Sequence, residues 1–124
     1  PVSCAIGLAV LDAIEEGDLM RNARDVGRVL MGGLEDLKER HPIIGDVRGR
    51  GLFIGFELVR DRETKEPATA EAKRVVREML SRNVLMSTDG PHSNVIKIKP
   101  PMVITEEDAI HTLESLDEVL ASLQ

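Results

Sequence analysis

The spacing of hydrophobic residues changes along this chain, and that change limits the possible folds more than any other feature of the sequence. Over residues 1–14 and 18–40, apolar side chains recur every three or four positions, as they do on one face of a helix. Over residues 52–59 they alternate with other residues, which indicates a strand with one buried face. A chain of 124 residues has the length of one domain. The pattern therefore predicts a single domain that combines helices with a sheet.

Shorter elements complete the predicted order. We expect a helix over residues 70–82 with Thr69 as its cap, and a last helix that a capping box at residues 105–108 opens. Short strands are expected at residues 46–51, 84–87 and 95–99. The order is helix, helix, two strands, helix, two strands, helix. It predicts an α+β fold in which helices cover one face of a small, mostly antiparallel sheet.

The boundary between the first two helices carries two signals. Gly17 is expected to take the left-handed conformation that often ends a helix. Asp18 is expected to start the next helix, with its carboxylate accepting hydrogen bonds from free backbone N–H groups. Three glycines within that second helix, Gly27, Gly32 and Gly33, each cost a helix roughly 1 kcal/mol relative to alanine. We therefore expect close packing against a neighbouring element at these positions.

The composition excludes several classes of function. The formal net charge of −6 has the wrong sign for binding a phosphate backbone, and a chain with two Phe, no Tyr and no Trp has few rings on which bases could stack. We therefore expect no nucleic-acid partner. The single cysteine, Cys4, excludes an internal disulfide, and its apolar surroundings predict a buried structural thiol. The sequence contains neither a membrane-spanning apolar run nor a signal peptide, so we expect a cytoplasmic protein without a membrane partner.

A glycine cluster at residues 49–55 is close to a dinucleotide-binding fingerprint. Its spacing differs by one residue, and a strand follows it instead of the helix whose N-terminus would hold a pyrophosphate. The cluster therefore predicts bends and close backbone packing within strands.

Two lysines are the first candidates for a binding role. Lys97 and Lys99 share one face of the expected strand 95–99, and isoleucines occupy the other face. Such lysines either protect the exposed edge of a sheet or form an anion site, where an ammonium meets a carboxylate or a phosphate. The residue pattern leaves both interpretations open.

His92 is the second candidate, because it lies in a polar loop over residues 88–94 that joins two strands. Loops held in this way often carry function, although the same residues also make ordinary turns. His41 and His111 are expected on exposed helix surfaces. No two histidines have the spacing of metal ligands.

Three stretches of the chain carry a resemblance to a known family. PVSCA at residues 1–5, ERHPIIGDVRGRGL at 39–52 and ELV at 57–59 resemble the C-terminal region of class III aminotransferases. These are pyridoxal-phosphate enzymes of fold type I and are generally dimers or larger. The resemblance implies that residues 1–124 are the C-terminal small domain of a longer enzyme, in keeping with a chain that starts at Pro1 and not at Met. Its partners would be its own large domain, a second subunit and a small-molecule amine or amino-acid substrate.

The resemblance places the Schiff-base lysine and the other cofactor-binding residues in the absent large domain. We therefore expect the complete enzyme to bind pyridoxal phosphate, and this chain alone neither to hold it firmly nor to catalyse a reaction. The role implied for the chain is to close over the active site and position the anionic end of the substrate. A stand-alone interaction or regulatory module is the alternative from a different class.

Lys97 occupies the position at which the family usually has an arginine, three residues before a Pro-Pro motif. That arginine forms a bidentate pair with the substrate α-carboxylate, which a lysine cannot reproduce. Residues 89–102 look more like the subgroup of alanine–glyoxylate aminotransferase 2, which includes phospho-lyases acting on phosphorylated amines. The resemblance thus implies Lys97, with His92 nearby, as substrate-binding residues, in either an aminotransferase or a phospho-lyase.

Overall fold

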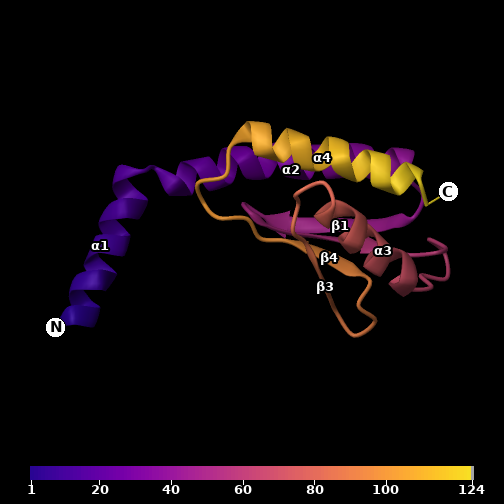
Figure 1. The fold of residues 1–124 in the computed structure, drawn as a ribbon, viewed down its shortest axis with the longest axis horizontal. Coiled ribbons are helices and arrows are strands. Elements are labelled where there is room, and N and C mark those ends of the chain that lie inside the picture. Colours follow the sequence, from indigo (N-terminus) through magenta and orange to yellow (C-terminus); the bar gives the residue numbers. More distant parts are fainter. Residues whose placement is uncertain (124) are drawn as a thin grey trace.

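Helices and strands follow one another along the chain in the predicted order: two helices, two strands, a helix, two strands and a last helix (Figure 1). The structure is a computed structural model and describes residues 1–123. Its helices are α1 (Val2–Glu16), α2 (Leu19–Arg40), α3 (Thr69–Leu80) and α4 (Glu106–Ala121). Its strands are β1 (Ile44–Arg50), β2 (Phe53–Leu58), β3 (Ser87–Asp89) and β4 (Val95–Ile98). The predicted α+β class is confirmed.

The strands form one sheet in the order β1-β2-β4-β3, and every neighbouring pair is antiparallel. Helices α2 and α3 pack against the strands, and α4 lies along both of these helices. Figure 1 shows α2 and α4 side by side above the sheet. The three helices therefore cover one face of the sheet, as the sequence predicts, and leave the opposite face open.

The hydrophobic core lies between the sheet and these helices. On β2, Ile54, Phe56 and Leu58 point into it, and Ile54 and Phe56 lie directly opposite Ile98 and Ile96 of β4. Burying side chains of this size stabilises a fold by about 1.5–3 kcal/mol each. The helices contribute their predicted apolar stripes, which include Leu30, Leu34, Leu37, Val75, Met79, Leu116 and Leu120. The alternation in β2 thus separates a buried face from a polar one.

Helix α1 differs from the other helices because none of its residues is buried. It contacts only α2 and projects away from the rest of the molecule (Figure 1). Its exposed apolar side chains are Val2, Ile6, Leu8, Val10 and Leu11. The prediction that Cys4 is buried is wrong, since Cys4 lies on this helix and is exposed. Within the described residues, no helix is long and apolar enough to cross a membrane.

The junction between α1 and α2 corrects two local predictions. Gly17 has a φ of −81°, and it is Asp18, with a φ of 46°, that takes the left-handed conformation. The Asp18 side chain makes no capping hydrogen bond, because a typical N-cap residue has an extended backbone. Its carboxylate lies 3.7 Å from Arg21 instead.

Two further boundaries differ from the prediction. Ala68 is the N-cap of α3, and the Thr69 hydroxyl donates instead to the backbone carbonyl of His92 at 2.6 Å. The strand expected at 84–87 begins at Ser87 and runs to Asp89. By contrast, the capping box of α4 is confirmed: Asp108 N donates to Thr105 Oγ1, and Thr105 N donates to an Asp108 carboxylate oxygen.

Two of the three glycines in α2 lie where a neighbouring element leaves no room for a side chain. A Cβ atom on Gly27 would lie 2.4 Å from the backbone oxygen of Gly51, and one on Gly33 would lie 2.2 Å from the Leu113 side chain. Close packing is thus confirmed at these positions. It is wrong for Gly32, which has nothing within 4 Å of a Cβ atom built there.

The end of α2 is fixed by polar contacts with α4 and with the loop after β2. His41 is 5% exposed, so the prediction of a surface histidine is wrong. Its Nε2 lies 2.6 Å from Asp117 Oδ1, and the Arg40 guanidinium contacts the same carboxylate, so together they lower the pKa of Asp117. Arg62 donates hydrogen bonds to backbone carbonyls around the end of α2, namely those of Lys38, His41, Pro42 and Ile44.

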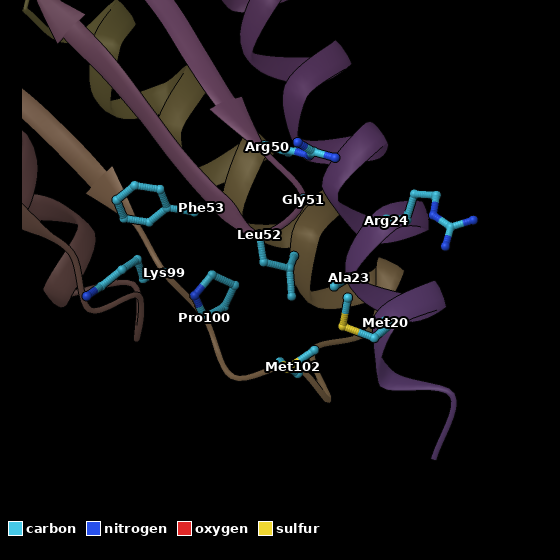
Figure 2. A pocket seen from close by; sticks show the side chains of 10 residues that line it. All are labelled: Met20, Ala23, Arg24, Arg50, Gly51, Leu52, Phe53, Lys99, Pro100 and Met102. Atoms are coloured by element: carbon cyan, nitrogen blue, oxygen red, sulfur yellow. The ribbon is translucent and has the colours of Figure 1, made fainter. Parts of the chain in front are cut away.

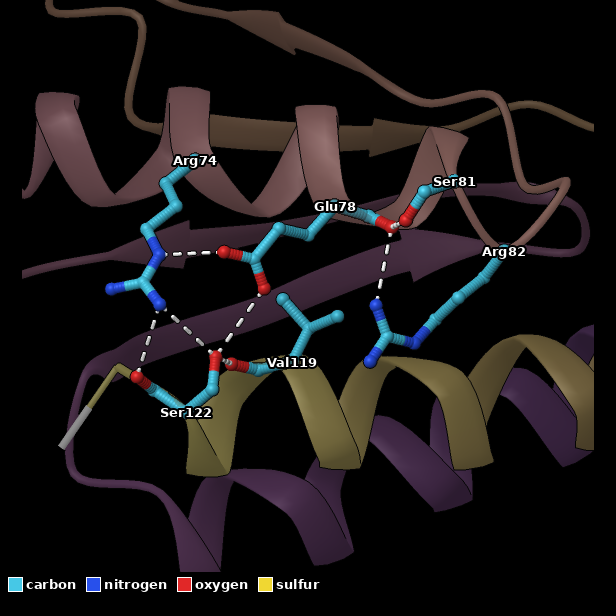
Figure 3. A network of polar contacts seen from close by, with 6 residues as sticks. All are labelled: Arg74, Glu78, Ser81, Arg82, Val119 and Ser122. Atoms are coloured by element: carbon cyan, nitrogen blue, oxygen red, sulfur yellow. Dashed lines mark hydrogen bonds and ion pairs between the residues drawn. The ribbon is translucent and has the colours of Figure 1, made fainter.

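A second polar network joins α3 to the end of α4 (Figure 3). Arg74 Nε donates to Glu78 Oε1 at 2.6 Å, and Ser122 Oγ donates to Glu78 Oε2 at 3.3 Å. Arg74 also donates to the Ser122 carbonyl. The Arg74 contact is the main cause of the lowered pKa of Glu78. Both networks lie on the helical side of the molecule, away from the open sheet face.

Candidate functional site

The open face of the sheet carries its side chains in rows that run across the strands. Residues directly opposite each other on neighbouring strands point to the same face, so the register defines each row. One row is mainly acidic and holds Asp46, Glu57, Val95 and Asp89. The next row holds Arg48, Gly55, Lys97 and Ser87. The third holds Arg50 and Phe53, and Lys99 follows directly after β4 on the same side.

Lys97 lies near the centre of this face, on β4 between its two neighbours. Its Nζ donates to Asp89 Oδ2 at 2.8 Å, and Asp89 Oδ1 accepts a hydrogen bond from the backbone N–H of Gly90. These contacts lower the pKa of Asp89, with Lys97 as the largest cause. The ammonium of Lys97 is therefore held and partly neutralised by a carboxylate.

Arg48 is held in the same way on the other side of Gly55. Its guanidinium donates to Asp46 at 2.6 Å and to Glu57 at 3.1 Å, and these contacts, Asp46 first, raise the pKa of Arg48. Gly55 lies directly opposite both Arg48 and Lys97 and has no side chain. This leaves a central hollow of about 500 Å³, lined by Arg48, Gly49, Phe53, Ile54, Gly55, Asp89, Gly90, Val95 and Lys97.

His92 lies in the turn between β3 and β4 and is exposed. The turn is anchored by Asn94, which is 2% exposed and whose Nδ2 donates to the carbonyl of Leu58 at 2.9 Å. The His92 carbonyl accepts from Thr69, but His92 is not among the residues that line the central hollow. The structure thus places His92 on the loop beside the open face and does not bring it against Lys97.

A second hollow of about 550 Å³ lies between α2, the β1–β2 turn and the segment after β4 (Figure 2). We call it the basic hollow; it is lined by Met20, Ala23, Arg24, Arg50, Gly51, Leu52, Phe53, Lys99, Pro100 and Met102. The sequence pattern alone predicts no binding role for Arg24 or Arg50. Arg50 has the strand parity of Arg48, a signal that would have placed it on the open face.

No group of three or more histidine, cysteine, aspartate or glutamate side chains within residues 1–123 is arranged to hold a metal ion. The described chain therefore offers charged side chains on an open sheet face, and such groups bind anionic or zwitterionic ligands by hydrogen bonds and ion pairs.

Helices on one face of an antiparallel sheet define an α+β domain, and in this chain the other face is open and charged. The family model of aminotransferase class-III matches residues 1–120. The chain therefore belongs to the class-III aminotransferase family, and the resemblance seen in the sequence is confirmed.

Individual relatives support this assignment. The chain is 46% identical over 122 residues to alanine–glyoxylate aminotransferase 2 homolog 2, mitochondrial, of Arabidopsis thaliana, covering 98% of this chain and 26% of that protein. A phospholyase from Arthrobacter in complex with phosphoethanolamine has a TM-score of 0.94 at 42% identity, covering 100% and 29% of the two chains. An amine transaminase from an uncultivated Pseudomonas species, in the PLP-bound form, has a TM-score of 0.87 at 36% identity, covering 100% and 28%. The chain thus spans between a quarter and a third of the length of these relatives.

The family uses pyridoxal phosphate, which forms a Schiff base with a lysine in an enclosed site. Lys97 and Lys99 are the lysines that line the two hollows described above, and both stand on an open surface. Lys97 is bound to Asp89, and a Schiff base on Lys99 would be exposed to water. Neither Lys97 nor Lys99 therefore fits the role of a Schiff-base lysine in an enclosed pyridoxal-phosphate site.

Proposed function

We propose that this chain is the C-terminal small domain of a class-III enzyme and that Lys97 positions the anionic end of an amine or amino-acid substrate. The observation that carries the proposal is the place of Lys97: it lies on an inner strand, on the face that the helices leave open, beside the central hollow. A buried core lies directly behind it, so the ammonium is held at a defined position.

The contact with Asp89 defines how Lys97 would bind. An ammonium is a compact point charge with three donors, so Lys97 can keep Asp89 as one partner and offer another N–H to a substrate oxygen. A dianionic phosphate competes with the Asp89 carboxylate better than a single carboxylate does, because it carries more charge.

Phospho-lyase activity on a phosphorylated amine is the second candidate. It is supported by the similarity to the Arthrobacter phospholyase in complex with phosphoethanolamine and by a lysine where the family usually has an arginine. His92, on the loop beside β4, is the further substrate contact in this proposal. Cofactor binding and bond cleavage would belong to the large domain.

The large domain is also the proposed partner of α1. This helix presents apolar side chains to water from Val2 to Leu11 and has no buried residue. Exposed apolar surfaces of this kind mark interaction sites. In the proposed enzyme, which we expect to be a homodimer or larger, the large domain covers α1. The rival proposal, a stand-alone module, predicts a start codon just before Pro1, whereas the enzyme proposal predicts an upstream coding region with a Schiff-base lysine.

Kinetics of the complete enzyme that contains this chain test the role of Lys97. We expect Lys97→Ala to raise the KM for phosphoethanolamine at least tenfold, which corresponds to about 1.4 kcal/mol of binding. Lys73→Ala, on the exposed surface of α3, is the matched control and should leave KM unchanged. An unchanged KM in Lys97→Ala would remove Lys97 from the site. A larger effect on alanine than on phosphoethanolamine would favour the aminotransferase over the phospho-lyase.

A further inference from the structure

Three cations surround the basic hollow, and within residues 1–123 none of them forms an ion pair or a side-chain hydrogen bond. They are Arg24 of α2, Arg50 at the end of β1 and Lys99 after β4. No acidic residue lines this hollow, although the chain as a whole carries a net charge of −6. In Figure 2, Arg24 and Arg50 lie on one side of the hollow, and Lys99 lies on the other. The hollow is therefore a local positive region on an acidic protein.

The floor between these cations is apolar. Phe53 lies directly opposite Arg50 and beside Lys99, and 64% of its surface is exposed. Met20 is also 64% exposed, and the floor continues through Leu52, Pro100 and Met102. An exposed aromatic ring between two unpaired cations can bind a ligand in two ways at once: the ring packs against an apolar group while the cations bind an anionic group.

The walls of the hollow are held in place before any ligand binds. Asn22 Nδ2 donates to the carbonyls of Met102 at 2.8 Å and Ile104 at 2.9 Å, which fixes the segment after β4 to α2. On the opposite wall, Gly27 lies so close to Gly51 that no side chain fits between them. A preformed site loses less conformational freedom on binding than a flexible one.

We propose that the basic hollow binds an amphipathic anion, in which a carboxylate or phosphate group is attached to a planar apolar body. Arg50 and Lys99 bind the anionic group, and the apolar body packs on Phe53. The volume of about 550 Å³ lies within the range of about 300–1,000 Å³ that is usual for small-molecule sites. This proposal is independent of the proposed role of Lys97, which does not line the basic hollow.

Titration of the isotopically labelled chain with phenyl phosphate, followed by NMR, tests the proposal. We expect the largest shifts at the amides of Arg50, Phe53 and Lys99. The double variant Arg50→Gln/Lys99→Gln should weaken binding at least fivefold. The matched control Lys73→Gln/Arg77→Gln makes the same change of charge on exposed positions of α3 and should bind as the original chain does.

Three results would overturn the proposal: unchanged affinity in the Arg50→Gln/Lys99→Gln variant, an equal loss in the control, or shifts confined to another surface. Inorganic phosphate carries only the anionic part of the ligand, and benzyl alcohol carries only the aromatic part. Each should bind at least fivefold more weakly than phenyl phosphate, and equal binding of inorganic phosphate would contradict the role of the ring. Phe53→Ala should bring the affinity for phenyl phosphate down to that for inorganic phosphate, with an unchanged circular dichroism spectrum as the check on folding.

Discussion

The central hollow and the basic hollow both contain arginine and lysine, but within the described part of the chain these cations are ion-paired in the first and unpaired in the second. In the central hollow, Arg48 and Lys97 are both held by carboxylates within about 3 Å. In the basic hollow, Arg50 and Lys99 have no such partner among the described residues, although they lie only one row further along the same face. The position of a charged residue on a strand thus decides which face of the sheet it occupies. Whether it can bind a ligand depends on whether the neighbouring row supplies a carboxylate that pairs with it.

The largest difference in stability should appear when a methyl group is added to Gly27, which packs against Gly51 of the basic hollow, and to Gly55 of the central hollow. Gly27→Ala places a carbon 2.4 Å from the backbone of Gly51, and we expect a loss of about 2–3 kcal/mol in the free energy of unfolding. In the central hollow, the new carbon of Gly55→Ala lies 3.3 Å from a methyl group of Val95. This variant should change the free energy of unfolding by less than about 1 kcal/mol. Urea denaturation measures both variants.

Gly32→Ala is the control for this pair, because nothing lies within 4 Å of the new carbon. It should stabilise α2 by about 0.5–1 kcal/mol. If Gly27→Ala were as stable as Gly32→Ala, the close contact between α2 and the β1–β2 turn would be wrong.

Two asparagines anchor the two hollows, and removing them should have unequal effects. Asn94→Ala leaves the buried carbonyl of Leu58 without its side-chain donor, and we expect a loss of about 2 kcal/mol. Asn22→Ala removes hydrogen bonds in a half-buried place and should cost about 1 kcal/mol. Thermal unfolding ranks the two variants, and the reverse order would contradict the burial of Asn94.

Lowering the pH should also distinguish the two hollows, with a smaller effect on the free energy of unfolding. The pKa of Asp89 is lowered from its ordinary value of 3.8 when the chain folds, mainly by Lys97. Its contribution to stability is therefore present above pH 3.8 and is lost as the pH falls through the lower pKa of the folded state. We expect Asp89→Asn to lose less stability than the original chain between pH 5 and pH 2.5.

Lys99→Gln serves as the comparison, because Lys99 forms no ion pair with Asp89 and is only the last of the causes that lower the pKa of Asp89. Its loss of stability over the same pH range should lie much closer to that of the original chain than the loss in Asp89→Asn does. A pH dependence of Asp89→Asn equal to that of the original chain would show that the contact between Lys97 and Asp89 does not stabilise the fold.

The smallest expected effect is the response of the isolated chain to pyridoxal phosphate. Since Lys97 is held by Asp89 and Lys99 is exposed, we expect no internal-aldimine absorbance band that survives dialysis. A stoichiometric band that persisted would contradict the proposal that the cofactor is held by a large domain outside this chain.

The sequence predicts the main elements and the two faces of the sheet well, because both follow from local periodicity. The alternation over β2 separates Phe56 from Glu57, and the capping box of α4 depends on residues only three positions apart. The errors arise where distant segments decide the outcome. His41 is buried because Asp117, 76 positions away, lies against it, and Cys4 is exposed because α1 leaves the body of the molecule.

The same distinction applies to the candidate site. The strand pattern is enough to place Lys97 and Lys99 on one face. It does not reveal that Asp89 neutralises Lys97 or that Arg24 lies across the basic hollow from Lys99, since these contacts depend on how strands pair and where α2 crosses the turn. Family resemblance implies a substrate-binding role for Lys97, which stays a prediction, and it does not distinguish a paired cation from an unpaired one.

Helix α1 should be much less stable locally than the helices that share the hydrophobic core. A helix of 15 residues that packs on almost nothing is only marginally stable in water, whereas α2 and α4 share the core. Its backbone amides should therefore exchange with deuterium through local opening, at rates far above those of Leu30 or Leu116. Protection of α1 would appear only when another protein surface covers it, so hydrogen exchange reports directly on assembly.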